Sequence, residues 1–150
     1  MWKDTIDKRL TKWQEFRNKL NSMEFSDALE KTAELWRTVP CRSFYLDPSE
    51  PDTWPDPWEL LVDNYYCDVA KCLGIIYTIY FTNHSDKLDL AVRVYENSDP
   101  RGLHTVVWVN DGDYILNWTD GEIVNKKQLN ENKIRLLYHY NTNDLVLHQY

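Results

Sequence analysis

The first 40 residues place apolar and polar side chains with the period of an α-helix. Residues 1–20 carry an apolar side chain at every third or fourth position, with charged side chains between them. Residues 26–39 repeat this spacing, begin at Ser26 as a possible N-cap and stop before Pro40. The pattern predicts two amphipathic helices, each burying one face. The apolar positions are Trp2, Ile6, Leu10, Trp13, Phe16 and Leu20 in the first, and Leu29, Ala33 and Trp36 in the second.

A proline-rich segment, residues 41–57, follows these helices and predicts an extended loop. It runs into "DPWE", where Asp56 can cap a helix, Pro57 suits the first helical position and Glu59 can close a capping box. We therefore expect a short helix over 57–62. A second helix is expected over 64–73, ended by Gly74 as a left-handed C-cap.

After Gly74 the period of the apolar positions changes from 3.6 to 2, which predicts β-strands separated by short turns. Helices followed by hairpin-linked strands indicate an α+β fold with a mostly antiparallel sheet. We expect one domain over 1–150, with a helical part at 1–40 and a cysteine helix plus sheet at 57–150. The predicted strands are residues 75–81, 87–95, 103–109, 113–118, 133–140 and 144–150.

The Asp-Gly pair at 111–112 is a strong signal for a two-residue hairpin turn. Such a turn places Trp108 opposite Ile115 and puts His104 and Asn117 on the same face as diagonal neighbours. In one interpretation Asn117 orients the imidazole of His104, which acts as a general base for a nearby nucleophile. In the other, both are polar residues at strand ends whose hydrogen bonds are made by backbone or water.

Composition and charge exclude several classes of protein. A net charge of −7 argues against duplex nucleic acid as a partner, because phosphate binding needs clustered Lys and Arg. The longest near-apolar run, "LGIIYTIYF", is too short to span a bilayer, so no membrane association is expected. Three cysteines without a CxxC pair or a leading apolar segment favour a reducing, cytoplasmic setting.

Cys67 is the cysteine best placed to act as a nucleophile. A helix that begins near Asn64 puts Cys67 in its first turn, where backbone N–H groups and the macrodipole favour the thiolate. Cys72 falls near the other end of that helix, and Cys41 lies outside any strong element. The alternative is that Cys67 is a small buried apolar side chain, since free cysteine is among the most buried residue types.

The order of Cys67, His104 and Asn117 resembles the transglutaminase-like and papain-like cysteine enzyme superfamily. Within it, "CDVAK…LGI" resembles the cysteine helix of bacterial transglutaminase-like cysteine peptidases, and "LHTVVWVNDGDYILNW" resembles their histidine strand, turn and acid or amide strand. The resemblance covers about residues 57–120. It implies a transglutaminase-like core, thiol attack on an amide of a protein or peptide, and an acyl-enzyme that is resolved by hydrolysis or amine transfer. No cofactor is expected. Aligning the family's cysteine helix on Ala70 instead puts Tyr66 at the nucleophile position, which leaves the site inactive.

Aromatic side chains supply the remaining candidate binding residues. The stretch "TWPDPWELL" is either a loop pinned by buried Trp54 and Trp58 over the cysteine helix or an aromatic wall of a substrate cleft. Tyr66 and Trp108 are the other two candidates for substrate contact. His139 and His148 share a face if the "NTND" turn is tight, but no cysteine or carboxylate pattern completes a site, so no metal is expected.

A non-catalytic interaction or assembly protein on the same scaffold is the alternative function. The chain is 14% aromatic and holds only 4 glycines, a composition that suits a rigid interaction surface. The "WPDPWEL" and "YILN" segments also resemble small proteins of tailed bacteriophages. That resemblance implies a virion component or an inhibitor of a host protein, located in the virion or the host cytoplasm.

Overall fold

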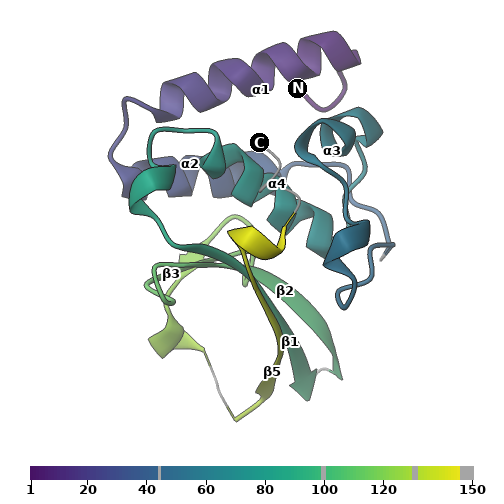
Figure 1. Ribbon diagram of the computed structural model, residues 1–150, viewed down its shortest axis with the longest axis vertical. Coiled ribbons are helices and arrows are strands. Elements are labelled where there is room, and N and C mark those ends of the chain that lie inside the picture. The colour runs from purple at the N-terminus through teal and green to yellow at the C-terminus, as the bar shows by residue number, and fades with distance from the viewer. Residues whose placement is uncertain (44, 99–100, 130–131, 146–150) are drawn as a thin grey trace.

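The computed structural model describes residues 1–150 apart from 44, 99–100, 130–131 and 146–150 (Figure 1). Four helices precede a five-stranded sheet whose neighbouring strands are all antiparallel, in the order β4-β3-β2-β1-β5. The predicted α+β fold is confirmed. The elements are α1 (Ile6–Leu20), α2 (Phe25–Arg37), α3 (Pro57–Asp63), α4 (Asp68–Tyr80), β1 (Leu90–Ser98), β2 (Arg101–Val109), β3 (Tyr114–Leu116), β4 (Ile123–Val124) and β5 (Ile134–Asn141).

The first three helices form close to where their patterns predict them. Helix α2 begins after Glu24 as its N-cap, so the expectation that Ser26 caps it is wrong. Helix α3 has the capping box expected from "DPWE": the Asp56 carboxylate accepts from the Glu59 N–H at 2.8 Å, and the Glu59 carboxylate accepts from the Asp56 N–H. Local capping chemistry therefore fixes the start of α3.

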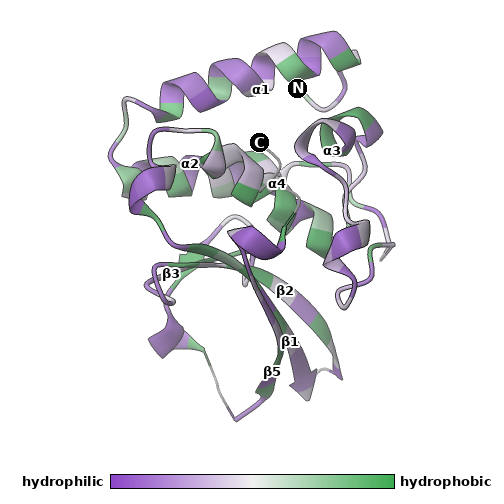
Figure 2. Ribbon diagram, viewed as in Figure 1, coloured by the Kyte–Doolittle hydropathy of each residue, from purple (hydrophilic) through white to green (hydrophobic). Residues whose placement is uncertain are grey.

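Helix α4 packs between the other helices and the sheet, and it is the centre of the core (Figure 1). Every residue from Val69 to Ile79 is buried. The strand predicted over 75–81 is wrong, and Gly74 lies inside the helix instead of ending it. A helix buried on all sides has no polar face, so its apolar run lacks the 3.6-residue period and reads like a buried strand (Figure 2).

The central part of the sheet buries side chains on both of its faces. Val107, Val109 and Leu116 pack against the helices, while Val106, Trp108 and Ile115 belong to a second apolar cluster on the opposite face. The predicted hairpin register is confirmed, with Trp108 opposite Ile115. The residues of the turn, 110–112, all have positive φ, as a tight turn of this hand requires.

Asn117 departs from the predicted alternation of faces. Strand β3 ends at Leu116, and Asn117 takes a left-handed conformation with φ of 69°. Because this conformation interrupts the period of two, the Asn117 side chain points toward α4. Trp118 consequently packs edge-on against Tyr95 on the far face.

Two further differences concern the C-terminal third of the chain. The short strand β4 has no counterpart in the sequence prediction, since two residues carry no readable period. The strand predicted over 144–150 falls mostly outside the described residues, and so does the proposed pairing of His139 with His148. Among the described residues, no helix is long and apolar enough to cross a membrane.

Candidate functional site

Cys67 is the N-cap residue of α4, one position earlier than the first turn in which the sequence places it. Its backbone is extended, and its carbonyl accepts the first hydrogen bond of the helix from the Lys71 N–H at 2.9 Å. Cys67 is only 3% exposed and packs in the apolar cluster on the helix side of the sheet. A thiolate here would lie at the positive end of the α4 macrodipole.

His104 and Asn117 meet through the backbone of Asn117. The His104 Nε2 atom lies 2.7 Å from the Asn117 carbonyl oxygen. A carbonyl oxygen only accepts, so Nε2 carries the proton in neutral His104 and Nδ1 keeps the lone pair. The imidazole also stacks on Trp118, with ring centroids 4.8 Å apart and 10° between planes. His104 is therefore oriented by a carbonyl and an indole, where the sequence predicted the Asn117 amide.

The Asn117 amide points into a separate polar cluster between β2 and α4. Its Nδ2 donates to Asp68 Oδ1 at 2.7 Å and to the Thr105 carbonyl at 3.1 Å, and it lies 3.5 Å from Cys72 Sγ. Asn117 is 7% exposed and Thr105 is 2% exposed, so these bonds form out of contact with bulk water. The N–H groups of the Asn117 amide therefore have hydrogen-bond acceptors.

Asp68 joins the start of α4 to the strands that carry His104 and Asn117. Its Oδ2 accepts from the backbone N–H of Thr105 at 3.0 Å, while Oδ1 accepts from Asn117. A carboxylate in the first helical turn also interacts favourably with the macrodipole. Asp68 directly follows Cys67 and Thr105 directly follows His104, so this bond ties the two chain segments together. Across the described part of the chain, no hydrogen bond joins the Cys67 sulfur to the His104 ring itself.

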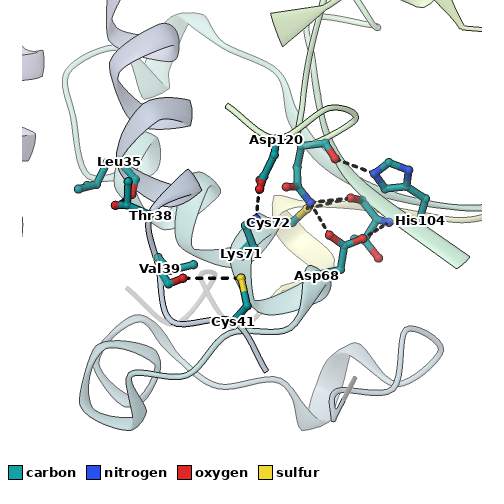
Figure 3. Close-up of polar contacts among 11 residues, drawn as sticks. Leu35, Thr38, Val39, Cys41, Asp68, Lys71, Cys72, His104 and Asp120 are labelled. Atoms are coloured by element: carbon teal, nitrogen blue, oxygen red, sulfur yellow. Dashed lines mark hydrogen bonds and ion pairs between the residues drawn. The ribbon is translucent and has the colours of Figure 1, made fainter. Parts of the chain in front are cut away.

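A second tie joins α4 to the loop after β3. Lys71 Nζ lies 2.5 Å from Asp120 Oδ1 (Figure 3). The Lys71 side chain is 9% exposed and the Asp120 side chain 56%, so the lysine is buried and its partner is at the surface. Asp120 lies three residues after Asn117, so this ion pair holds the segment that follows Asn117 against the helix.

The other two cysteines are poor nucleophile candidates. Cys72 is fully buried, and its thiol donates to the Thr105 carbonyl at 3.3 Å. Burial and the nearby Asp68 charge raise the pKa of the Cys72 thiol well above its ordinary value. Cys41 is exposed and lies beside the chain segment of Tyr66, to which it forms a parallel bridge. Neither thiol lies at the N-terminal end of a helix.

Two residues of the site carry little signal in the sequence. Asp68 reads as an ordinary acidic residue of a first helical turn, and its tie to β2 depends on contacts 37 and 49 positions away. Tyr45 donates from its hydroxyl to the Tyr65 carbonyl at 2.9 Å. Burial, followed by the charge of the neighbouring Cys67, raises the pKa of Tyr45. Its hydrogen bond and ring contact with Tyr65 place Tyr45 beside the segment that leads into Cys67, although it belongs to the proline-rich loop.

Two of the four aromatic candidates for substrate contact are buried structural side chains. Trp54 donates from Nε1 to the Asp47 carbonyl at 2.8 Å. Tyr66 is fully buried between the rings of Trp2 and Trp36. Burial leaves these two rings no face for a substrate.

Trp58 and Trp108 lie on different parts of the molecule. Trp58 is 42% exposed and packs edge-on against Trp13, so the expectation that it is buried over the cysteine helix is wrong. Trp108 lies on the far face of the sheet, with the Arg93 guanidinium 3.7 Å from its ring centroid. The structure does not gather the four aromatic candidates around Cys67.

Solved structures of similar fold come from the bacterium Legionella pneumophila. Calcium-bound LapG superposes with a TM-score of 0.71 at 18% identity, covering 90% of this chain and 75% of that chain. Two further LapG structures, one of them EGTA-treated, give TM-scores of 0.69 and 0.71 at 19% identity, covering 91% of this chain and 74% of those chains. No family model matches the sequence, and no curated protein matches it.

At less than 20% identity the likeness shows the fold alone: this chain has the same transglutaminase-like fold as LapG. The expected transglutaminase-like core is therefore confirmed. The resemblance to phage proteins, and with it the roles of virion component and host inhibitor, finds no support in these structures.

Proposed function

We propose that this protein is a thiol-dependent amide hydrolase that acts on proteins or peptides, with Cys67 as nucleophile and His104 as general base. The observation that carries the proposal is the hydrogen bond from His104 Nε2 to the Asn117 carbonyl. That bond fixes the tautomer whose Nδ1 can take a proton from a thiol. The position of Cys67 at the start of α4 supports the same assignment.

The reaction follows from these two groups. His104 Nδ1 takes the Cys67 proton, and the thiolate attacks the carbonyl carbon of the substrate amide. The resulting tetrahedral oxyanion collapses, the C–N bond breaks, and the protonated imidazole gives its proton to the departing amine. Water, deprotonated by the same imidazole, then attacks the thioester, releasing the acid and restoring the thiol.

Asn117 has a different role in this proposal from the one in the sequence prediction. Its carbonyl oxygen, not its amide, accepts from Nε2–H and stabilises the imidazolium that forms when Nδ1 takes the thiol proton. Val106 and Trp108 belong to the cluster on the far face of the sheet, and His104 shares their face by alternation, so the proposal requires the ring to reach Cys67 around the beginning of β2. The bonds of Asp68 to Asn117 and to the N–H after His104 keep that end of β2 beside the helix start.

Access to the thiol is the second requirement of the proposal. Because Cys67 is 3% exposed, an incoming amide has to displace a neighbouring side chain before the sulfur can attack. Tyr45 is the candidate, since it contacts Tyr65 in the segment that leads into Cys67, is 37% exposed and comes from a loop without regular structure. We expect Tyr45→Ala to raise the rate at which Cys67 reacts.

The test is cleavage of a mixture of unstructured peptides, with new termini and deamidated glutamines identified by mass spectrometry. The wild type and Cys41→Ala should form the same products, because Cys41 lies outside the site. Cys67→Ala and His104→Ala should form none. Products that persist in Cys67→Ala would overturn the proposal, as would a wild type that forms none while its Cys67 reacts with alkylating agents no faster than Cys72.

A further inference from the structure

We infer that Asp68 is a positioning residue that forms a matched pair with Asn117 and thereby holds His104 beside the start of α4. The inference rests on the proposed function only for its catalytic consequence. The pairing itself concerns the orientation and tautomer of His104, which can be measured in a protein that has no activity.

The contacts use both oxygens of the carboxylate. Asp68 Oδ2 binds the N–H of Thr105, which follows His104, and Oδ1 binds the Asn117 amide, whose own carbonyl binds His104. His104 is thus connected to Asp68 twice, through the backbone of the next residue and through Asn117. A hydrogen bond to a carboxylate is stronger than one between neutral groups, more so where water is excluded.

The identity of residue 117 is matched to Asp68. The amide hydrogens of Asn117 face only acceptors: the Asp68 carboxylate, the Thr105 carbonyl and the Cys72 sulfur. An aspartate at 117 would place a second carboxylate against the first at hydrogen-bond distance, where two like charges cannot both stay ionised at low cost. This cluster therefore requires an amide at position 117, even though the family resemblance allows an acid or an amide there.

Asn117 transmits the position of Asp68 to His104 through its backbone. Its left-handed φ of 69° points the side chain toward Asp68 and the carbonyl toward the imidazole. Asparagine adopts this conformation only at a small cost, which a side-chain bond can offset. Without the Asp68 bond, the carbonyl is free to turn, and Nε2 loses the acceptor that fixes its proton.

The pair can be tested against a matched control within the same interface. Asp120 also ties α4 to the loop after β3, through Lys71, but it contacts neither Asn117 nor Thr105. Asp120→Asn should therefore lower stability without changing His104. Asp68→Asn should change His104, since one amide oxygen cannot replace both carboxylate oxygens without turning its NH₂ toward another donor.

The experiment is ¹⁵N NMR of the His104 ring, which distinguishes the two neutral tautomers, on Asp68→Asn, Asn117→Asp, the double exchange and Asp120→Asn. We expect a pure Nε2–H form in the wild type and in Asp120→Asn, and a mixture in each single variant at 68 or 117. The double exchange restores a donor facing an acceptor between 68 and 117 but leaves a carboxylate oxygen against the Thr105 carbonyl, so it should recover part of the wild-type signal. Turnover should fall by about 10²-fold in Asp68→Asn, the scale expected for a misplaced catalytic group.

A wild-type His104 spectrum in Asp68→Asn would overturn the inference, and so would an equal change in Asp120→Asn. A double exchange that is worse than both single variants would also contradict a matched pair. Should Asn117→Asp fail to fold, Asp68→Asn decides alone. If products persist in Cys67→Ala, the proposed function fails, while the ring spectrum still reports on the pair.

Discussion

Gly74→Ala is expected to destabilise the protein, although alanine is the better helix former. Gly74 lies in the middle of α4, and a Cβ at this position would lie 2.3 Å from two atoms of the Trp36 ring and 2.6 Å from a third. An ordinary contact begins near 3.4 Å, so the indole has to retreat by about 1 Å. Trp36 is completely buried and its Nε1 donates to Thr78 at 3.0 Å, so it has no free direction in which to move.

The magnitude follows from three opposing effects. Overpacking of a filled core costs about 1–3 kcal/mol, and loss of the Trp36 hydrogen bond costs about 1 kcal/mol. The gain in helix propensity returns about 1 kcal/mol. We therefore expect a net loss of about 1–3 kcal/mol in the free energy of unfolding, measured by urea denaturation. Gly102→Ala is the control, because no atom lies within 4 Å of its Cβ position. A Gly74→Ala protein as stable as the wild type would refute the reasoning.

Two further predictions concern the core and the sheet edge. Thr78→Val should cost about 2–5 kcal/mol in urea denaturation, because Trp13 and Trp36 both donate to the Thr78 hydroxyl and would be left as buried N–H groups without an acceptor; Thr78→Ser should retain most of that stability. Burial and the Arg93 charge lower the pKa of His139. Near pH 6.5 the histidine is protonated in the unfolded chain but not yet in the folded chain. Protonation therefore favours the unfolded state, and the free energy of unfolding decreases as pH falls below about 7. His139→Gln should flatten this dependence between pH 5 and 8, and an unchanged slope would exclude His139 as its source.

Local chemistry in the sequence predicts the parts of the fold that depend on neighbours along the chain. The Asp56–Glu59 capping box and the register of Trp108 with Ile115 both follow from short motifs, and both are present. Helix α4 could not be read correctly, because Ile75 and Ile76 are β-branched and a fully buried helix shows no polar face. Its length is set by packing against Trp36 and the sheet, which no local pattern records.

In the candidate site too, the features set by neighbours along the chain could be predicted, and those set by distant contacts could not. The placement of His104 on a strand could be predicted from spacing, and so could the position of Cys67 near a helix start, although the helix expected from residue 64 begins at Asp68. The direction of the Asn117 side chain could not, because one left-handed residue reverses the face that the alternation assigns. Asp68 was missed for a related reason: its two partners lie on other strands, and a single acidic residue at a helix start has an adequate local explanation.

The most direct test of the central claim is the pH dependence of Cys67 alkylation in the wild type and in His104→Ala, followed by mass spectrometry. Exposed Cys41 serves as the internal reference, because an unactivated buried thiol has to react more slowly than an exposed one. If His104 activates Cys67, Cys67 should react faster than Cys41 near pH 6, and the His104→Ala variant should lose at least about tenfold of that rate. A Cys67 that reacts more slowly than Cys41 at every pH, with a rate unaffected by His104→Ala, would contradict the account.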